Sequence, residues 1–234
     1  MFSLRALAIT ATEVPNILWN NGNPFPVEWE NTLMDCFYSE ITAEGTADYS
    51  NEDTSRNYCE WRGVVCTAGK VGRVIYDQQD YGNFDIHSLP PTVTRISIEH
   101  CLQHYMLHTR RLPRASQFCY LGNNQLFGSV ELRTLPENLV TLRLSDNRLN
   151  GPIDLTNLPQ KFAYLWLHRN AIEQSVVFFG RLPPNITAIR LATSGKRDNQ
   201  IGELRALYPE SLDRARQVFR PPVQIKFYSN EAIQ

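Results

Sequence analysis

A Leu-Pro dipeptide recurs at a nearly constant interval through the middle of the chain, and this recurrence constrains the fold more than any other feature. The five copies begin at Leu89, Leu112, Leu135, Leu158 and Leu182, so the successive offsets are 23, 23, 23 and 24 residues. A period this regular is typical of a protein built from stacked repeats. Each repeat then buries its apolar side chains against its neighbours, so the stability of the array is shared between repeats and their interfaces.

Alignment of the copies on their Leu-Pro start shows columns of shared residue type. The seventh and ninth residues after the start are apolar in every copy, namely Ile96, Cys119, Leu142, Leu165 and Ile189, and Ile98, Leu121, Leu144, Leu167 and Leu191. The twelfth is small and polar, namely Cys101, Asn124, Asn147, Asn170 and Ser194. Because side chains alternate along a strand, the apolar columns should point inward. We expect the polar column to hydrogen-bond to neighbouring backbone.

The segment from Leu139 to Leu149 carries the pattern LxxLxLxxNxL, and through it the chain resembles the leucine-rich repeat family. The resemblance implies an α/β repeat solenoid, a right-handed coil of about five to six turns with a parallel β-sheet on its concave face and a helical N-terminal cap. The segment 149–153 also matches the LxGxI segment of the plant-specific repeat subclass, and 126–130 matches it more loosely, which implies an extra short strand on the side or convex face. The Leu-Pro punctuation is similar, more loosely, to short leucine-rich repeat proteins of trypanosomatid parasites.

The residues that precede the repeats have the pattern of an end cap. An amphipathic helix is predicted by apolar residues at i, i+4, i+7 and i+8, namely Trp29, Leu33, Cys36 and Phe37. We expect this stripe to lie over the open end of the first coil, although a partner-binding face is the alternative. The polar stretch 42–57 predicts a loop.

The segment from Cys59 to Cys66 fills every fixed position of CxWxGVxC and resembles the N-terminal cap of plant-type leucine-rich repeat receptors. The resemblance implies a disulfide between Cys59 and Cys66, with Trp61 packed on the end of the solenoid. Metal binding is the competing interpretation, but two cysteines without a second nearby pair make a poor zinc site.

Three units follow from these patterns: a cap at 1–66, leucine-rich repeats at 67–194, and a C-terminal cap or tail at 195–234. Val71, Val74 and Tyr76 have the spacing of inward residues in a degenerate first coil. The period is lost after 194, and the segments 202–207 and 210–219 could be helical, with prolines ending the second.

The outward strand positions supply the candidate binding surface, because repeat proteins commonly bind partners on the concave face. Large aromatic residues and arginines, which are enriched at binding hot spots, occupy many of these positions. The candidate partner-binding residues are Arg95, Phe118, Tyr120, Arg143, Tyr164, Trp166, His168 and Arg190. Because adjacent strands lie about 4.8 Å apart, four of these residues should form one lateral row across the sheet, namely Tyr120, Arg143, Trp166 and Arg190. The alternative is that the two arginines of this row merely cover the ring faces by cation-π contact.

Other site types find less support. A net charge of -1 gives no general attraction to nucleic acid, and no apolar stretch is long enough to span a bilayer. His100, His104 and His108, with Cys101, suggest a metal site, but the repeat register places His100 at a strand end and Cys101 in the polar column. No arrangement of nucleophile and base is evident, so we expect no cofactor and no catalysis.

These observations favour a non-catalytic protein that binds a protein or peptide partner. The alternative is a structural or antigenic cell-surface repeat protein without one high-affinity ligand. A Cys59 to Cys66 bridge and the glycosylation sequon at Asn185 indicate an extracellular or cell-surface location. The weak apolar character of the first residues and the unpaired cysteines favour the cytoplasm instead, and we give the extracellular reading a slight preference.

Overall fold

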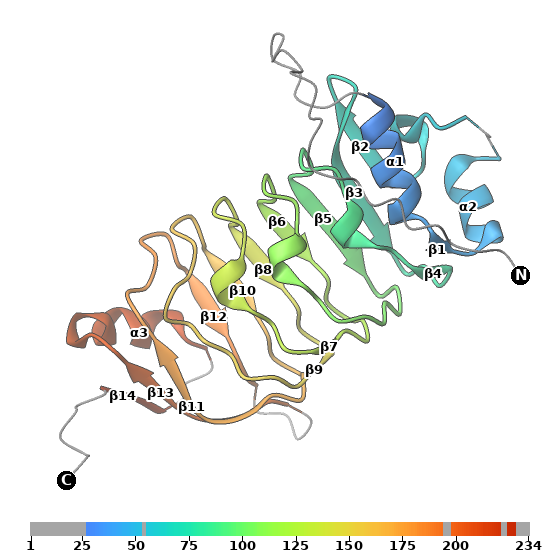
Figure 1. Ribbon diagram of the computed structural model, residues 1–234. Helices are drawn as coiled ribbons and strands as arrows, with labels where there is room; N and C mark the ends of the chain where they lie inside the picture. Colours follow the sequence, from blue (N-terminus) through green and yellow to red (C-terminus); the bar gives the residue numbers. More distant parts are fainter. Residues whose placement is uncertain (1–26, 53–54, 194–197, 221–223, 228–234) are drawn as a thin grey trace, which may run out of the picture.

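The chain winds into a solenoid in the computed structural model, which describes residues 27–52, 55–193, 198–220 and 224–227 (Figure 1). A seven-stranded sheet runs the length of the solenoid in the order β12-β10-β8-β6-β5-β3-β2. Its strands are β2 (Val64–Thr67), β3 (Lys70–Asp77), β5 (Arg95–Glu99), β6 (Phe118–Tyr120), β8 (Thr141–Arg143), β10 (Tyr164–Trp166) and β12 (Ala188–Arg190). All neighbours are parallel except β2 and β3. The predicted repeat solenoid with a parallel sheet is therefore confirmed.

The inner columns of the repeat form the core, as the alternation of side chains predicts. Residues of the seventh column pair in register from strand to strand, beginning with Val74 in β3 and ending with Ile189 in β12. The ninth-column residues are at most 1% exposed, namely Ile98, Leu121, Leu144, Leu167 and Leu191. The degenerate first coil is also confirmed, because Val71, Val74 and Tyr76 are buried.

The asparagine column forms a hydrogen-bonded ladder inside the solenoid. Asn147 accepts from the Leu126 N–H (2.9 Å) and donates to the carbonyl oxygens of Leu121 (2.9 Å) and Leu144 (3.2 Å). Asn124 and Asn170 make equivalent bonds one coil earlier and one coil later. The next member is Asn199, which donates to Leu167 and Leu191 and accepts from Ile172. It fills the role expected of Ser194, which lies outside the described residues.

The Leu-Pro dipeptides mark a turn that every coil repeats. The carbonyl of each turn proline accepts a backbone hydrogen bond from the residue three positions later, at 3.0 to 3.1 Å in all five copies. Short 3-10 helices precede three of these turns, at Ile86–Ser88, Thr109–Arg111 and Leu132–Thr134. The expected extra strands are present as the short parallel pair β7 (Phe127–Gly128) and β9 (Arg148–Leu149). The strand β7 lies within segment 126–130, whereas β9 overlaps segment 149–153 only at Leu149.

The N-terminal cap contains α1 (Val27–Phe37), β1 (Glu40–Ile41), α2 (Ala43–Ser50) and a 3-10 helix at Tyr58–Glu60, and β1 pairs with β4 (Gly82–Asn83). The predicted helix over α1 is confirmed, but its buried stripe is shifted. Trp29 is 63% exposed and Cys36 is exposed, whereas the buried residues are Glu30, Met34, Phe37 and Tyr38. The predicted loop at 42–57 is wrong in part, because α2 begins after Thr42, whose hydroxyl accepts from the Gly45 N–H.

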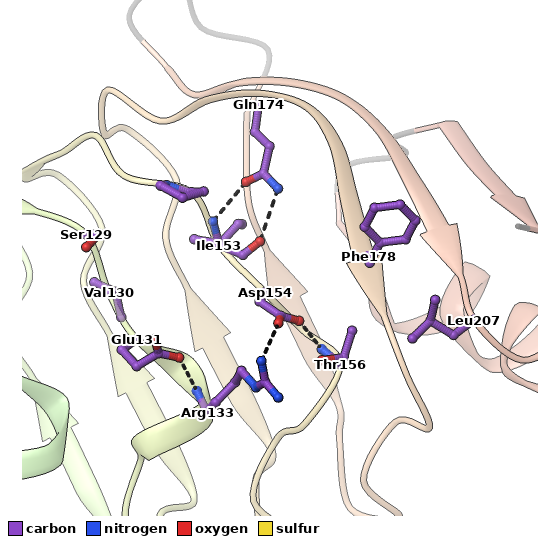
Figure 2. A pocket seen from close by; sticks show the side chains of 11 residues that line it. Ser129, Val130, Glu131, Arg133, Ile153, Asp154, Thr156, Gln174, Phe178 and Leu207 are labelled. Carbon is purple, nitrogen blue, oxygen red and sulfur yellow. Dashed lines mark hydrogen bonds and ion pairs between the residues drawn. The ribbon is translucent and has the colours of Figure 1, made fainter.

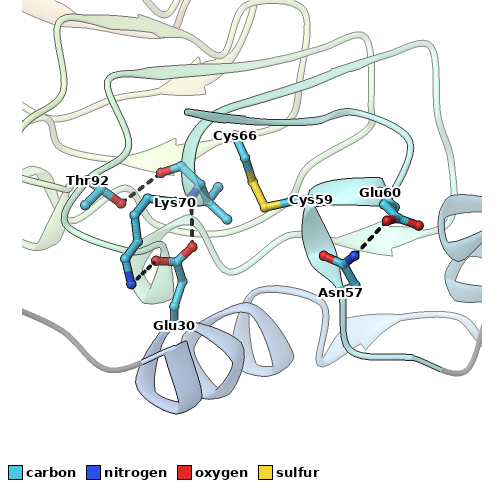
Figure 3. Close-up of a disulfide and its surroundings, with 8 residues drawn as sticks. Glu30, Asn57, Cys59, Glu60, Cys66, Lys70 and Thr92 are labelled. Atoms are coloured by element: carbon cyan, nitrogen blue, oxygen red, sulfur yellow. Dashed lines mark hydrogen bonds and ion pairs between the residues drawn. A yellow bond between two sulfur atoms is a disulfide. The ribbon is translucent and has the colours of Figure 1, made fainter. Parts of the chain in front are cut away.

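A disulfide joins Cys59 to Cys66, as the resemblance implied, and so ties the 3-10 helix to β2 (Figure 3). Trp61, between the two cysteines, is 8% exposed and packs against the Tyr38 ring at 4.7 Å. The Glu30 carboxylate accepts from the Val71 N–H at 2.8 Å, which anchors α1 to β3. The N-terminal end of the sheet is therefore covered by aromatic packing and fixed by polar contacts.

The C-terminal end departs from the sequence prediction. Segment 202–207, expected to be helical, lies mostly in β13 (Gln200–Ala206), which pairs in parallel with β11 (Glu173–Phe179) and β14 (Gln224–Phe227). The ladder residue Asn199 stands five positions after Ser194, where the repeat spacing placed it, so five residues are inserted in this coil. Leu204 and Ala206 alternate inward in β13, and the strand therefore continues the repeat beyond this insertion. The second predicted helix is confirmed, as a 3-10 turn at Pro209–Ser211 and α3 (Leu212–Val218). Within the described ranges, no helix combines the length and apolar character needed to cross a bilayer.

Candidate functional site

The outward side chains of β5, β6, β8, β10 and β12 and the residues at the tenth position of each repeat form one surface, which we call the sheet face. The tenth-position residues are Glu99, Gly122, Ser145, His168 and Ala192. The strand register confirms the predicted alignment: Tyr120 pairs with Arg143, Arg143 with Trp166, and Trp166 with Arg190. A second row aligns Arg95, Phe118, Thr141 and Tyr164. His168 follows β10 in the next row. A binding role for these residues stays a prediction.

Aromatic rings on the sheet face associate in pairs along single strands. The rings of Phe118 and Tyr120 lie 6.5 Å apart and nearly parallel, and those of Tyr164 and Trp166 lie 5.4 Å apart with 12° between their planes. All four side chains are half-buried, so Trp166 is less exposed than its position suggested. The rings form two flat apolar platforms, one on β6 and one on β10, separated by Arg143 on β8.

The arginines of this face have different partners from those that the cation-π alternative requires. Arg95 lies over the Tyr120 ring, with its guanidinium carbon 4.9 Å from the ring centre. Arg143 pairs with Glu99, Nη1 to Oε1, at 3.4 Å. Arg190 is exposed and forms no ion pair with any residue that the structure describes. Arg190 is therefore an exposed cation on this surface that has no carboxylate partner among the described residues.

Gly122 leaves the space through which the ion pair crosses from β5 to β8. A methyl group at this position would lie 3.0 Å from Glu99 Oε1, 3.3 Å from the Ser145 carbonyl oxygen and 3.5 Å from Arg143 Nε. The sequence reasoning assigned no role to Gly122 or Ser145. A glycine in a row otherwise occupied by side chains, at the tenth position of the repeat, was the signal that could have identified the first.

Four polar atoms on the sheet face are buried without a hydrogen-bond partner in the described part of the chain: Arg95 Nε, Glu99 Oε1, Ser145 Oγ and His168 Nδ1. Glu99 Oε1 still has its ion pair with Arg143, so the other three atoms have no polar partner. Burial lowers the pKa of His168, and the positive charge of Arg190 lowers it further, so the imidazole is neutral near pH 7. An unsatisfied buried polar group costs about 1–3 kcal/mol. Such groups call for an explanation, and a ligand that supplies partners is one.

A cavity of about 630 Å³ lies elsewhere on the solenoid, lined by residues of the segments 129–133, 152–156, 174–178 and Leu207 (Figure 2). The longer polar side chains that line it have partners. Gln174 bonds to the backbone N–H and carbonyl of Ile153 at 2.8 and 3.2 Å, and Arg133 pairs with Asp154 at 3.6 Å. The cavity therefore offers fewer unmet polar groups than the sheet face.

The histidine segment is dispersed along the turns of its coil. His100 bonds through Nδ1 to Asp77 at 2.9 Å, the His104 ring lies 5.0 Å from the Phe127 ring, and the His108 N–H donates to His87 Nε2 at 3.0 Å. Among the described residues, no group of three or more His, Cys, Asp or Glu side chains could hold a metal ion.

The three cysteines outside the disulfide and the sequon asparagine differ in burial. Cys101 and Cys119 are buried, and burial raises the pKa of their thiols to about 11 and about 12, which makes both poor nucleophiles. Cys36 is an exposed free thiol. Asn185 is exposed in the turn before β12, where a glycan would have access.

No family model matches this sequence, and no curated protein matches it. Solved structures similar to the chain include a pollen receptor kinase 3, with 20% identity over 84% of this chain and 92% of that chain at a TM-score of 0.47. The BIR2 ectodomain from Arabidopsis thaliana has 16% identity over 83% and 96% at 0.48. The leucine-rich repeat ectodomain of the Arabidopsis receptor kinase HAESA, solved with an IDA peptide hormone ligand, has 17% identity over 86% and 41% at 0.41.

At these identities and TM-scores the similarities do not assign the chain to a family. The fold is established by the chain's own geometry, which combines the parallel strand register, the leucine columns and the asparagine ladder. The protein therefore folds as a parallel β-solenoid with the leucine-rich repeat pattern, and a disulfide joins Cys59 to Cys66 at its N-terminal end.

Proposed function

We propose that the protein is a non-catalytic binding protein that captures an extended protein or peptide segment on the sheet face. The observation that carries this proposal is the set of buried, unpartnered polar atoms on Arg95, Ser145 and His168 beside two aromatic platforms. A peptide backbone carries both donors and acceptors, so an extended segment could satisfy these atoms with small side-chain adjustments.

Each part of the face has a distinct role in this proposal. Tyr164 and Trp166 supply apolar anchor area, because flat, half-buried rings lose little conformational freedom on binding. Arg190, which lacks a carboxylate partner among the described residues, provides a charge-assisted bond. Arg143, paired with Glu99 at 3.4 Å, lies between the two platforms and orients the bound segment through charge-assisted bonds.

The flanking segments fit the same proposal. We assign residues 1–66 to a cap of the plant-receptor type, 67–194 to the repeats and 195–234 to the closure of the C-terminal end. The Cys59–Cys66 disulfide supports an oxidising location, outside the cell or at its surface. A glycan at Asn185 and kinship with trypanosomatid leucine-rich repeat proteins belong to this proposal as well.

The test begins with selection of peptides from a random display library on the purified protein. Affinity of a selected peptide is then measured by isothermal titration for the double variant Trp166→Ala/Arg190→Ala. The matched control is Trp29→Ala/Arg148→Ala, which removes the same two residue types from exposed positions on α1 and β9.

We expect the sheet-face variant to lose at least about 100-fold in affinity, since truncation of a hot-spot residue costs about 2 kcal/mol or more. The control should bind as the wild type does. Equal affinity in the sheet-face variant would refute this surface. Selection that yields only weak, salt-sensitive peptides would instead favour a structural or antigenic surface protein.

A further inference from the structure

A cationic groove lies beside the Leu-Pro turns, away from the sheet-face side chains. It has a volume of about 680 Å³ and is formed by the turn segments of three consecutive coils. Its lining residues are Arg110, Arg114, Leu132, Arg133, Thr134, Leu135, Glu137, Asn138, Asn157, Leu158, Pro159, Gln160 and Lys161.

The groove concentrates positive charge in a chain whose net charge is slightly negative. Four cations and one carboxylate, Glu137, line it, which leaves a local excess of three positive charges, whereas the whole chain has a net charge of -1. Such a local excess attracts anions even when the total charge does not.

The cations are held in place without being neutralised. Arg114 Nη2 donates to the Arg110 carbonyl oxygen at 3.2 Å, and Lys161 Nζ donates to Asn138 Oδ1 at 2.7 Å. Arg110, Arg114 and Lys161 are exposed, and no ion pair joins them to any residue within the described ranges. Only Arg133 has a carboxylate neighbour, Asp154, at 3.6 Å. Three charges therefore remain available to a ligand.

Hydrogen bonds join the two adjacent coils that carry Arg110 and Arg133. The Thr109 hydroxyl lies 2.7 Å from the Thr134 hydroxyl and also bonds to the Glu131 carbonyl oxygen at 2.7 Å. These contacts fix the 3-10 turn that carries Arg110 against the next one, which carries Arg133. The spacing between the two arginines is thus set by the solenoid, which lowers the ordering cost of binding.

The uncharged residues that line the groove indicate which class of polyanion it fits. Asn138, Asn157 and Gln160 offer amide groups that match sugar hydroxyls, and no aromatic side chain lines the groove. Proteins that bind single-stranded nucleic acid without sequence preference combine a cationic groove with aromatic rings on which bases stack. The Cys59–Cys66 disulfide also favours an oxidising compartment, where sulfated glycans occur and nucleic acid is scarce.

From these observations we infer that the groove binds a sulfated polysaccharide, with Arg110, Arg114 and Lys161 contacting its sulfate groups. Arginine suits this task because its planar fork can donate two hydrogen bonds to one oxyanion. Binding here is independent of peptide capture, because none of the groove residues belongs to the sheet face.

The test uses a fluorescently labelled heparin octasaccharide and measures anisotropy at about 0.15 M ionic strength, where exposed charges are partly screened. The groove variant is Arg110→Ser/Arg114→Ser. The control, Arg148→Ser/Arg216→Ser, removes the same number of charges from exposed positions outside the groove. Loss of two ionic contacts should raise the Kd of the groove variant about tenfold or more, whereas the control should change it less than about twofold.

Several outcomes would overturn the inference. Wild-type protein that does not bind heparin, or equal weakening in both double variants, would show that no groove-specific site exists. Tighter binding of a single-stranded oligonucleotide than of heparin would assign the groove to nucleic acid. If the double variant does not fold, as judged by circular dichroism, the single Lys161→Gln variant decides the matter, with an expected loss of about threefold.

Discussion

The asparagine ladder predicts that substitutions of asparagines in adjacent coils have non-additive effects on the free energy of unfolding. The Leu121 carbonyl oxygen accepts from Asn124 Nδ2 at 3.1 Å and from Asn147 Nδ2 at 2.9 Å, and no other donor to it is present in the described residues. Loss of either asparagine leaves this oxygen one partner, and loss of both leaves it none. Asn124 and Asn170 share no acceptor.

The loss of unfolding free energy can be estimated from the buried polar groups that each substitution leaves without a hydrogen-bond partner. Asn147→Ala removes the acceptor of the Leu126 N–H and shortens a side chain that is 9% exposed, so it should cost about 2–4 kcal/mol. In Asn124→Ala/Asn147→Ala, the unpartnered Leu121 oxygen should add about 1–3 kcal/mol beyond the sum of the single variants. The pair Asn124→Ala/Asn170→Ala should be additive.

The assay is equilibrium urea unfolding followed by circular dichroism, applied to the wild type, the three single variants and the two double variants. The coupling free energy is obtained from each double-mutant cycle. Additive behaviour of Asn124→Ala/Asn147→Ala, within about 0.5 kcal/mol, would refute the shared-acceptor argument. Equal coupling in both pairs would show that the ladder acts through general loosening of the coils.

Further predictions concern the core, one buried histidine and one strained turn. Leu165→Ala, at a fully buried position of the seventh column, should lower the free energy of unfolding by about 2–5 kcal/mol in the same urea assay. Burial lowers the pKa of His87 from 6.5 to about 4, so its contribution to stability is fully present above pH 6.5 and is lost as pH falls toward 4. With the His87 side chain 8% exposed, the wild type should lose about 2–3 kcal/mol more than His87→Gln between pH 7 and 4.5, and parallel pH profiles would contradict this. Arg169 has a φ of 55°, so Arg169→Gly should raise the unfolding free energy by about 1 kcal/mol despite loss of its exposed pair with Asp146, and a lower melting temperature would argue against strain there.

The repeat period predicted most of the solenoid because one physical constraint acts on every coil. Residues that recur at the same place in each turn must meet across the strand register, so the inner columns and the outward row could be assigned from spacing alone. The five inserted residues before Asn199 broke that counting. Continuation of the ladder beyond the insertion depends on hydrogen bonds that spacing does not encode.

The cap was less predictable because long-range contacts override local pattern there. Hydrophobic spacing placed Trp29 inward, whereas the buried position belongs to Glu30, whose carboxylate finds partners on β3. The helix over 43–50 forms in a polar stretch because Tyr49 is buried against Tyr76, with ring centres 4.8 Å apart. Neither partner lies within the local sequence window that the prediction used.

The candidate site was predictable in position and not in detail. Spacing identified the rows of aromatic and basic side chains on the sheet face. The space at Gly122 and the unpartnered Ser145 hydroxyl depend on how neighbouring side chains settle, and so they required the structure. The cationic groove was also missed, because its charges come from three coils that each contribute only one or two.

Hydroxyl-radical footprinting with a selected peptide tests the sheet-face assignment most directly, because it reports the solvent exposure of individual aromatic side chains. Bound peptide should slow the oxidation of Trp166, Tyr164 and Tyr120 and leave Trp29 and Phe127, which lie outside the sheet face, unchanged. Unaltered oxidation of Trp166 together with protection of Phe178 at the cavity of Figure 2 would contradict the assignment.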